Sequence, residues 1–138
     1  MSPLEIVLFA LSVAIPLVAI VSGKTPERLA ALIFLVATAA TGLSGQIWKF
    51  RDIGNILLAI DGAMALAFLA MAIRYNYMWI ALMMGAMSGY FAVHAYYLIS
   101  HRALDETFAL MSNLATSVAL LSIAIGVWTS RPRAAEEA

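Results

Sequence analysis

The sequence contains no cysteine, and charged residues occupy only 12% of its 138 positions. The missing cysteine excludes disulfide bonds, thiol nucleophiles, CxxC redox centres and thiolate metal sites. Eight basic side chains are balanced by eight acidic ones, so no positive excess is present to bind the phosphates of a nucleic acid. Because no Walker loop, GxGxxG, HExxH, GxSxG or EF-hand pattern occurs either, we predict no catalytic residue, metal, cofactor or nucleic-acid partner.

Apolar residues are what the sequence has in abundance. They make up 64% of the chain, and its mean hydropathy is +0.93. A soluble domain contains about 45–50% apolar and about 25% charged residues. The composition therefore predicts an integral membrane protein whose main surroundings are the lipid bilayer.

Five apolar runs follow one another along the chain. Each is close to the length of about 20 residues that spans the hydrocarbon core. The linkers between them are short, which makes consecutive helices antiparallel. We predict an all-α polytopic transmembrane bundle that forms a single domain over residues 1–130, with a flexible tail at 131–138. The predicted spans are 3–22, 26–48, 53–73, 77–100 and 106–129.

Helix-capping residues precede these runs. Ser2 and Thr25 each stand before a proline, which is favoured at the first position of a helix. Asp52, Asn76 and Asp105 stand before the third, fourth and fifth runs, and their side chains can accept hydrogen bonds from free backbone N–H groups. We predict that these five residues cap the five helices.

The distribution of basic residues predicts an orientation. Five antiparallel spans place the two termini on opposite sides of the membrane. The positive-inside rule assigns the side richer in lysine and arginine to the cytoplasm. We therefore predict a multi-pass protein with its N-terminus outside and its C-terminus in the cytoplasm. The N-terminal side carries Lys49, Arg51 and Arg102, and the other side carries Lys24, Arg28, Arg74, Arg131 and Arg133.

Asp61 is the most informative residue, because it lies near the middle of the third span. An acidic residue at that depth costs about 2.5–3.5 kcal/mol on insertion scales and often marks an ion or proton pathway. His94 lies at a similar depth in the fourth span, since the two residues are about 12 and 9 Å from the same membrane side. They can meet and share a proton. The alternative is that both are structural polar groups that hold helices together.

Several other polar residues fall in the same half of the membrane. They are Ser12, Gln46, Asn55 and Asn113. One interpretation is a shallow polar vestibule that opens toward the N-terminal side. The other is a set of scattered hydrogen bonds between helices, which contribute about 0.6 kcal/mol each.

The fourth span carries two further patterns. Tyr90, His94, Tyr97 and His101 recur at helical spacing, which suits either a packed face or a quinone site. Ala81, Gly85 and Gly89 form a stripe of small residues, with similar stripes in the second and third spans. Such stripes let membrane helices approach closely and are a packing signal.

Four features of residues 24–100 form a recognisable pattern. They are the turn Lys24–Ala31, the mid-membrane Asp61, the Ala-Ile-Arg74 turn and the following His94. In these features the chain resembles a family of small inner-membrane proteins from alphaproteobacteria, especially sphingomonad-like and caulobacter-like species, to which no activity is assigned. Threonine stands in the first turn where the family has tryptophan. The resemblance implies an inner-membrane location and draws attention to Asp61, Arg74 and His94.

Three functional hypotheses follow. The first is a protein that is not an enzyme and acts as a structural or accessory component, through helix packing with itself or with a larger membrane complex. The second is a small proton-coupled transporter or channel-like protein that uses Asp61 and His94. The third is a quinone- or lipid-binding redox component built on the face of Tyr90. The residues proposed for binding or proton relay are Asp61, His94, Asn113, Gln46, Asn55, Tyr90 and Arg74.

Overall fold

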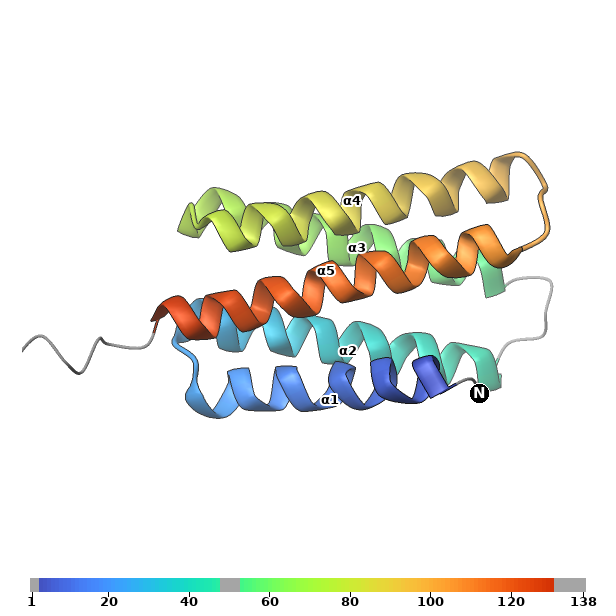
Figure 1. Cartoon of the computed structure of the whole chain (residues 1–138). Coiled ribbons are helices and arrows are strands. Elements are labelled where there is room, and N and C mark those ends of the chain that lie inside the picture. The colour runs from blue at the N-terminus through green and yellow to red at the C-terminus, as the bar shows by residue number, and fades with distance from the viewer. Residues whose placement is uncertain (1–2, 48–52, 131–138) are drawn as a thin grey trace, which may run out of the picture.

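Five helices make up the described part of the protein (Figure 1). The computed structural model describes residues 3–47 and 53–130, without the side chains of residues 4, 5 and 45–47. Within these ranges the chain forms helices and turns and no strand, which confirms the predicted all-α bundle. The helices are α1 Pro3–Ser22, α2 Thr25–Ile47, α3 Ile53–Tyr75, α4 Met78–Ile99 and α5 Glu106–Ser130.

Four of the helices, α2 to α5, are long and apolar enough to cross a membrane. The first helix, α1, has 20 residues and therefore rises about 30 Å, close to the thickness of the hydrocarbon core. Its apolar stretch, Ile6–Ser22, is shorter than those of the other four. The protein is thus a helical membrane protein. That α1 also spans the membrane stays a prediction.

The helices close into a ring. Each packs against its neighbours in the chain, α1 also packs against α5, and α2 touches α5 across the ring. Two of the turns are very short, at Gly23–Lys24 and at Asn76–Tyr77, so the helices they join run antiparallel (Figure 1). Large buried apolar side chains lie between the helices, among them Phe34, Phe68, Trp79, Ile80, Met83 and Ile123.

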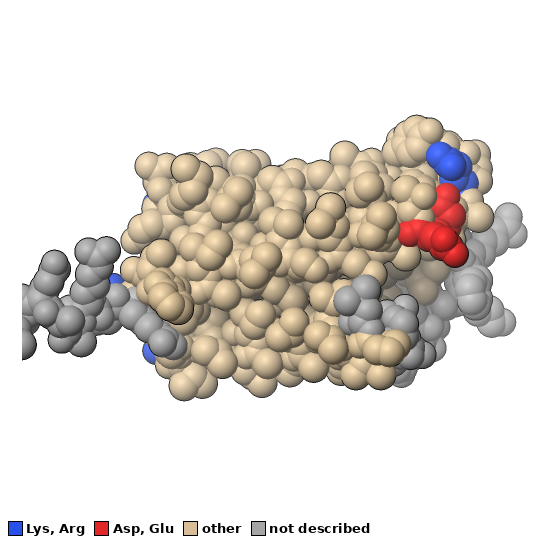
Figure 2. All heavy atoms as spheres, viewed as in Figure 1, with Lys and Arg blue, Asp and Glu red and all other residues tan. Residues whose placement is uncertain are grey.

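The surface of the bundle separates charged ends from an apolar middle. Figure 2 shows a broad uncharged belt, with acidic and basic side chains gathered at the ends of the molecule. Large apolar side chains such as Val21, Ile73 and Trp128 are exposed on this surface, as lipid contact requires. Among the side chains that the structure describes, Asp61 is the one Asp, Glu, Lys or Arg more than a turn away from a helix end.

Two of the predicted helix caps are wrong. Thr25 is already the first helical residue of α2, and Glu27 accepts the backbone N–H of Lys24 at 2.7 Å, as the acidic member of a capping box does. At α4 the N-cap is Tyr77, which makes no side-chain cap bond. Asn76 instead ends α3 with a left-handed φ of 48°, a conformation that asparagine tolerates well. The caps expected at Ser2 and Asp52 lie outside the described residues.

The cap predicted at Asp105 is confirmed. Its Oδ1 accepts the backbone N–H of Phe108 at 3.0 Å and the hydroxyl of Tyr97 at 2.8 Å. These two donors, the Phe108 N–H first, hold the pKa of the Asp105 carboxyl below its ordinary value, because both bonds favour the charged form. Asp105 therefore ties the end of α4 to the start of α5 at the membrane surface.

Candidate functional site

Asp61 and His94 form a buried pair between α3 and α4. The His94 Nδ1 and Asp61 Oδ2 atoms are 2.6 Å apart. Asp61 is 8% exposed and His94 is 2% exposed. The contact agrees with the depth comparison, which placed both side chains at one level of neighbouring antiparallel helices.

A close approach of α3 to α4 brings the pair together. Gly62 follows Asp61, and a Cβ atom added to it would lie 3.1 Å from Cε2 of Phe91 on α4. A side chain at position 62 would therefore crowd the Phe91 ring, which would have to shift by a few tenths of an ångström. Because glycine follows Asp61, α3 can lie close to α4, and the short Asp61 side chain can reach His94.

The hydrogen bond requires a proton between the two side chains. At 2.6 Å, either the histidine Nδ1–H donates it to the carboxylate or a protonated carboxyl donates it to Nδ1. With a neutral imidazole and a carboxylate, the pair carries one net negative charge. Binding one more proton, on either ring or carboxyl, makes the pair neutral. The pair can therefore hold or release a proton in the interior of the bundle.

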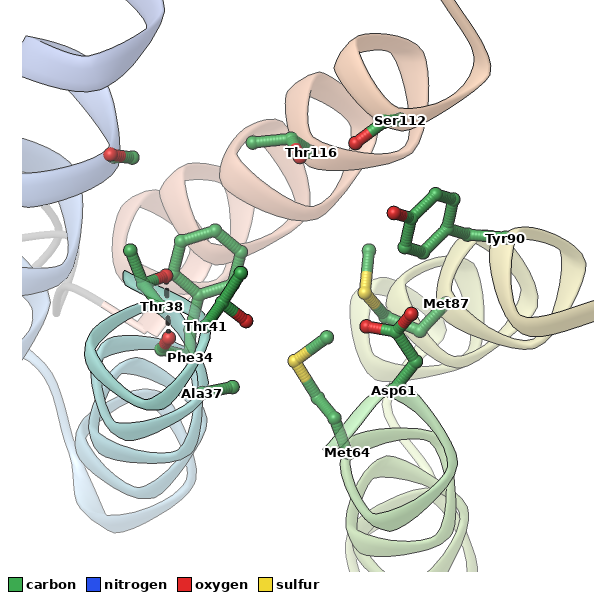
Figure 3. Close-up of a pocket in the computed structure, with 11 residues that line it drawn as sticks. Phe34, Ala37, Thr38, Thr41, Asp61, Met64, Met87, Tyr90, Ser112 and Thr116 are labelled. Carbon is green, nitrogen blue, oxygen red and sulfur yellow. Dashed lines mark hydrogen bonds between the residues drawn. The ribbon is translucent and has the colours of Figure 1, made fainter. Parts of the chain in front are cut away.

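The carboxyl group of Asp61 faces a central cavity of about 210 Å³ (Figure 3). All five helices contribute to its wall, and His94 stands behind Asp61 and does not line it. Six residues with hydroxyl groups contribute polar atoms to a wall that is mainly apolar. They are Ser12, Thr38, Thr41, Tyr90, Ser112 and Thr116, and the remaining lining residues are Phe34, Ala37, Met64 and Met87.

Aromatic rings enclose His94 on its other sides. Phe108 meets the imidazole edge-on with ring centroids 5.3 Å apart, and Tyr90 lies 6.1 Å from it. Phe108 also contacts Tyr97, whose hydroxyl is bonded to Asp105. The face of α4 that suggested a quinone site is thus packed against α5, while His101 lies beyond α4 and is exposed.

The other predicted site residues lie elsewhere. Asn55 is exposed on α3 and Asn113 is half-buried on α5, and neither lines the cavity. Arg74 is exposed at the opposite end of α3, with its guanidinium 5.6 Å from the centroid of the Tyr75 ring. The side chain of Gln46 is outside the described residues. Of the polar residues assigned to a vestibule at the N-terminal side, Ser12 lines the cavity, and Asn55 and Asn113 do not, so the vestibule stays a prediction.

Sequence reasoning did not single out the hydroxyl residues of α2 and α5 as site residues. Thr38 and Thr41 are three positions apart, and Ser112 and Thr116 are four apart, so each pair shares a helix face. This spacing is the sequence signal from which the two hydroxyl pairs could have been identified. Both pairs point into the cavity opposite Asp61 (Figure 3).

The described residues contain no cluster of three or more His, Asp or Glu side chains that could hold a metal ion. What the site offers is one acid, its histidine partner and a partly polar cavity. Comparisons of this chain with protein-family models, with curated proteins and with solved structures gave no match.

Proposed function

We propose that this membrane protein is a small proton-coupled transport protein in which the Asp61–His94 pair binds and releases the proton. The observation that carries the proposal is the 2.6 Å contact of a buried acid and a buried histidine at the wall of a partly polar cavity. A charged acid in a membrane interior is costly, about 2.5–3.5 kcal/mol on insertion scales, so its presence calls for a compensating role. A pair that becomes neutral on taking up a proton fulfils the role of a carrier.

We further propose an inner-membrane location in a bacterium, with the N-terminus outside. The end of the bundle that holds the α1–α2 and α3–α4 turns carries Lys24, Arg28 and Arg74 among the described residues, and the opposite end carries Arg102. The positive-inside rule then favours the first of these ends as the cytoplasmic one. The resemblance to alphaproteobacterial inner-membrane proteins supports the same assignment.

Proton flux into liposomes tests the proposal. Purified protein is reconstituted with a pH-sensitive dye inside, and valinomycin with a potassium gradient imposes a membrane potential. We expect the wild type to acidify the lumen, and Asp61→Asn to reduce the rate to that of empty liposomes, because asparagine cannot exchange a proton.

The matched control is Asp105→Asn, the same chemical change at the membrane surface. Asparagine caps helices as well as aspartate does, so this variant should fold and retain the wild-type flux. Equal flux from the wild type and Asp61→Asn would refute the proposal.

A second candidate function, an accessory component of a larger assembly, is supported by the stripe of small residues on α4. Gly85 and Gly89 are exposed, and a Cβ atom added to either would meet nothing within 4 Å. With Ala81 they line an apolar groove of about 510 Å³ between α4 and α5. Small residues that pack no helix of their own chain leave room for another helix. A protein of this kind would conduct no protons, so the flux assay separates the two candidates.

A further inference from the structure

We infer that the central cavity binds a small organic monocation, such as a protonated amine with one ring, in competition with the proton that the Asp61–His94 pair binds. The inference rests on the proposed function, because it takes the pair to release a proton. It adds the chemical class of a cation that the same site takes up.

The charge of the cavity favours a monocation. Asp61 is the one Asp, Glu, Lys, Arg or His among the residues that line it. The proton-free pair carries a single negative charge, which either one proton or one monovalent cation neutralises. A divalent metal ion would need several charged oxygens, and the wall supplies one carboxylate.

The lining favours an organic cation over a hydrated inorganic one. The rings of Phe34 and Tyr90 can receive a cation on their faces, and the thioethers of Met64 and Met87 are polarisable apolar contacts. The hydroxyl oxygens of α2 and α5 can accept the N–H groups of an ammonium. The cavity therefore combines apolar contact for a hydrocarbon body with acceptors for a charged head.

The volume of the cavity indicates a ligand size that fits inside it. An apolar protein cavity of about 150 Å³ accommodates benzene. A volume of about 210 Å³ therefore suits a six-membered ring with a short ammonium-bearing arm. Benzylammonium is a probe of this size and charge, and benzyl alcohol is its uncharged counterpart.

The binding step exchanges one cation for one proton. Benzylammonium enters the cavity, the neutral pair loses a proton to water, and the remaining negative charge is balanced by the bound cation. The titratable groups that face Asp61 are His94 and Tyr90, both from α4. The other helices bring Ser12, Phe34 and the hydroxyl residues of α2 and α5, which do not titrate. Binding should therefore weaken as the pH falls, because protons compete for the pair.

The experiment is a titration of benzylammonium into the purified full chain in weakly buffered detergent solution, with a pH indicator and a calorimeter as readouts. We expect saturable binding that releases one proton per cation at a pH at which the pair is neutral. Benzyl alcohol should release none, and Asp61→Asn should abolish both binding and proton release. Tyr90→Leu keeps the pair but removes one ring face, and should weaken binding roughly 2- to 30-fold while retaining the proton release.

Two other outcomes overturn the inference. If benzylammonium does not bind, while acid–base titration still shows one more proton in the wild type than in folded Asp61→Asn, the inference fails and the proposed function stands. If that acid–base difference is also missing, both fail. Asp61→Asn counts as folded when its elution profile and helical circular dichroism match those of the wild type. If Asp61→Asn does not fold, the test is whether Tyr90→Leu weakens the binding of benzylammonium.

Discussion

Replacing His94 with leucine should destabilise the protein by about 3–5 kcal/mol, the cost of removing one partner from a buried charged pair. The substitution leaves Asp61 in the bundle without its hydrogen-bond donor. An ordinary polar contact between membrane helices contributes only about 0.6 kcal/mol. The size of the loss therefore distinguishes a charged pair from a hydrogen bond that merely joins α3 to α4. Unfolding by denaturing detergent, followed by circular dichroism, measures it.

A double-mutant cycle supplies the control. Asp61→Leu combined with His94→Leu removes both polar groups, so no buried charge is left unpaired. We expect the double variant to be more stable than His94→Leu alone, since apolar replacement of a buried pair is often neutral. Strictly additive losses in the cycle would show that the two side chains do not interact, contrary to the 2.6 Å contact.

Replacing Gly126 with leucine should separate α4 from α5. A Cβ atom at this position would lie 2.8 Å from Cε2 of Trp79, and this tryptophan is only 5% exposed. Overpacking of this kind costs about 1–3 kcal/mol, and the further atoms of leucine place it at the upper end. The same unfolding measurement tests the expectation.

Gly85→Leu is the matched control for this substitution, because a side chain there meets open space. It should unfold like the wild type. If Gly126→Leu were equally harmless, α4 and α5 would not be packed through Trp79 as described.

The helices and the central pair could be predicted from the sequence because both depend on position along an axis. The length of an apolar run sets a span, and counting residues from its ends sets the depth of Asp61 and His94. The neighbouring polar residues were harder to place. Each residue turns the helix by about 100°, so Asn55 and Asn113 share a membrane half with Asp61 but point elsewhere.

The ends of the helices could also be predicted only in part. Asn76 suits both an N-cap and a left-handed helix end, and the sequence does not say which of two adjacent helices it serves. The structure assigns it to the end of α3, with its N–H bonded to the Ala72 carbonyl at 3.1 Å. The cap at Asp105 was predictable because the linker before it is long. Other residues in that linker end α4, so Asp105 can serve only the start of α5.

Infrared difference spectroscopy across a pH step tests most directly that Asp61 and His94 bind a proton in the membrane interior. The carbonyl stretch of a protonated carboxyl group is separate from the bands of the backbone and of asparagine. We predict that the difference between the wild-type and Asp61→Asn spectra contains a carboxyl band that rises and falls reversibly with pH, and that His94→Leu moves the midpoint of this band. A spectrum in which the wild type and Asp61→Asn are identical would contradict the account.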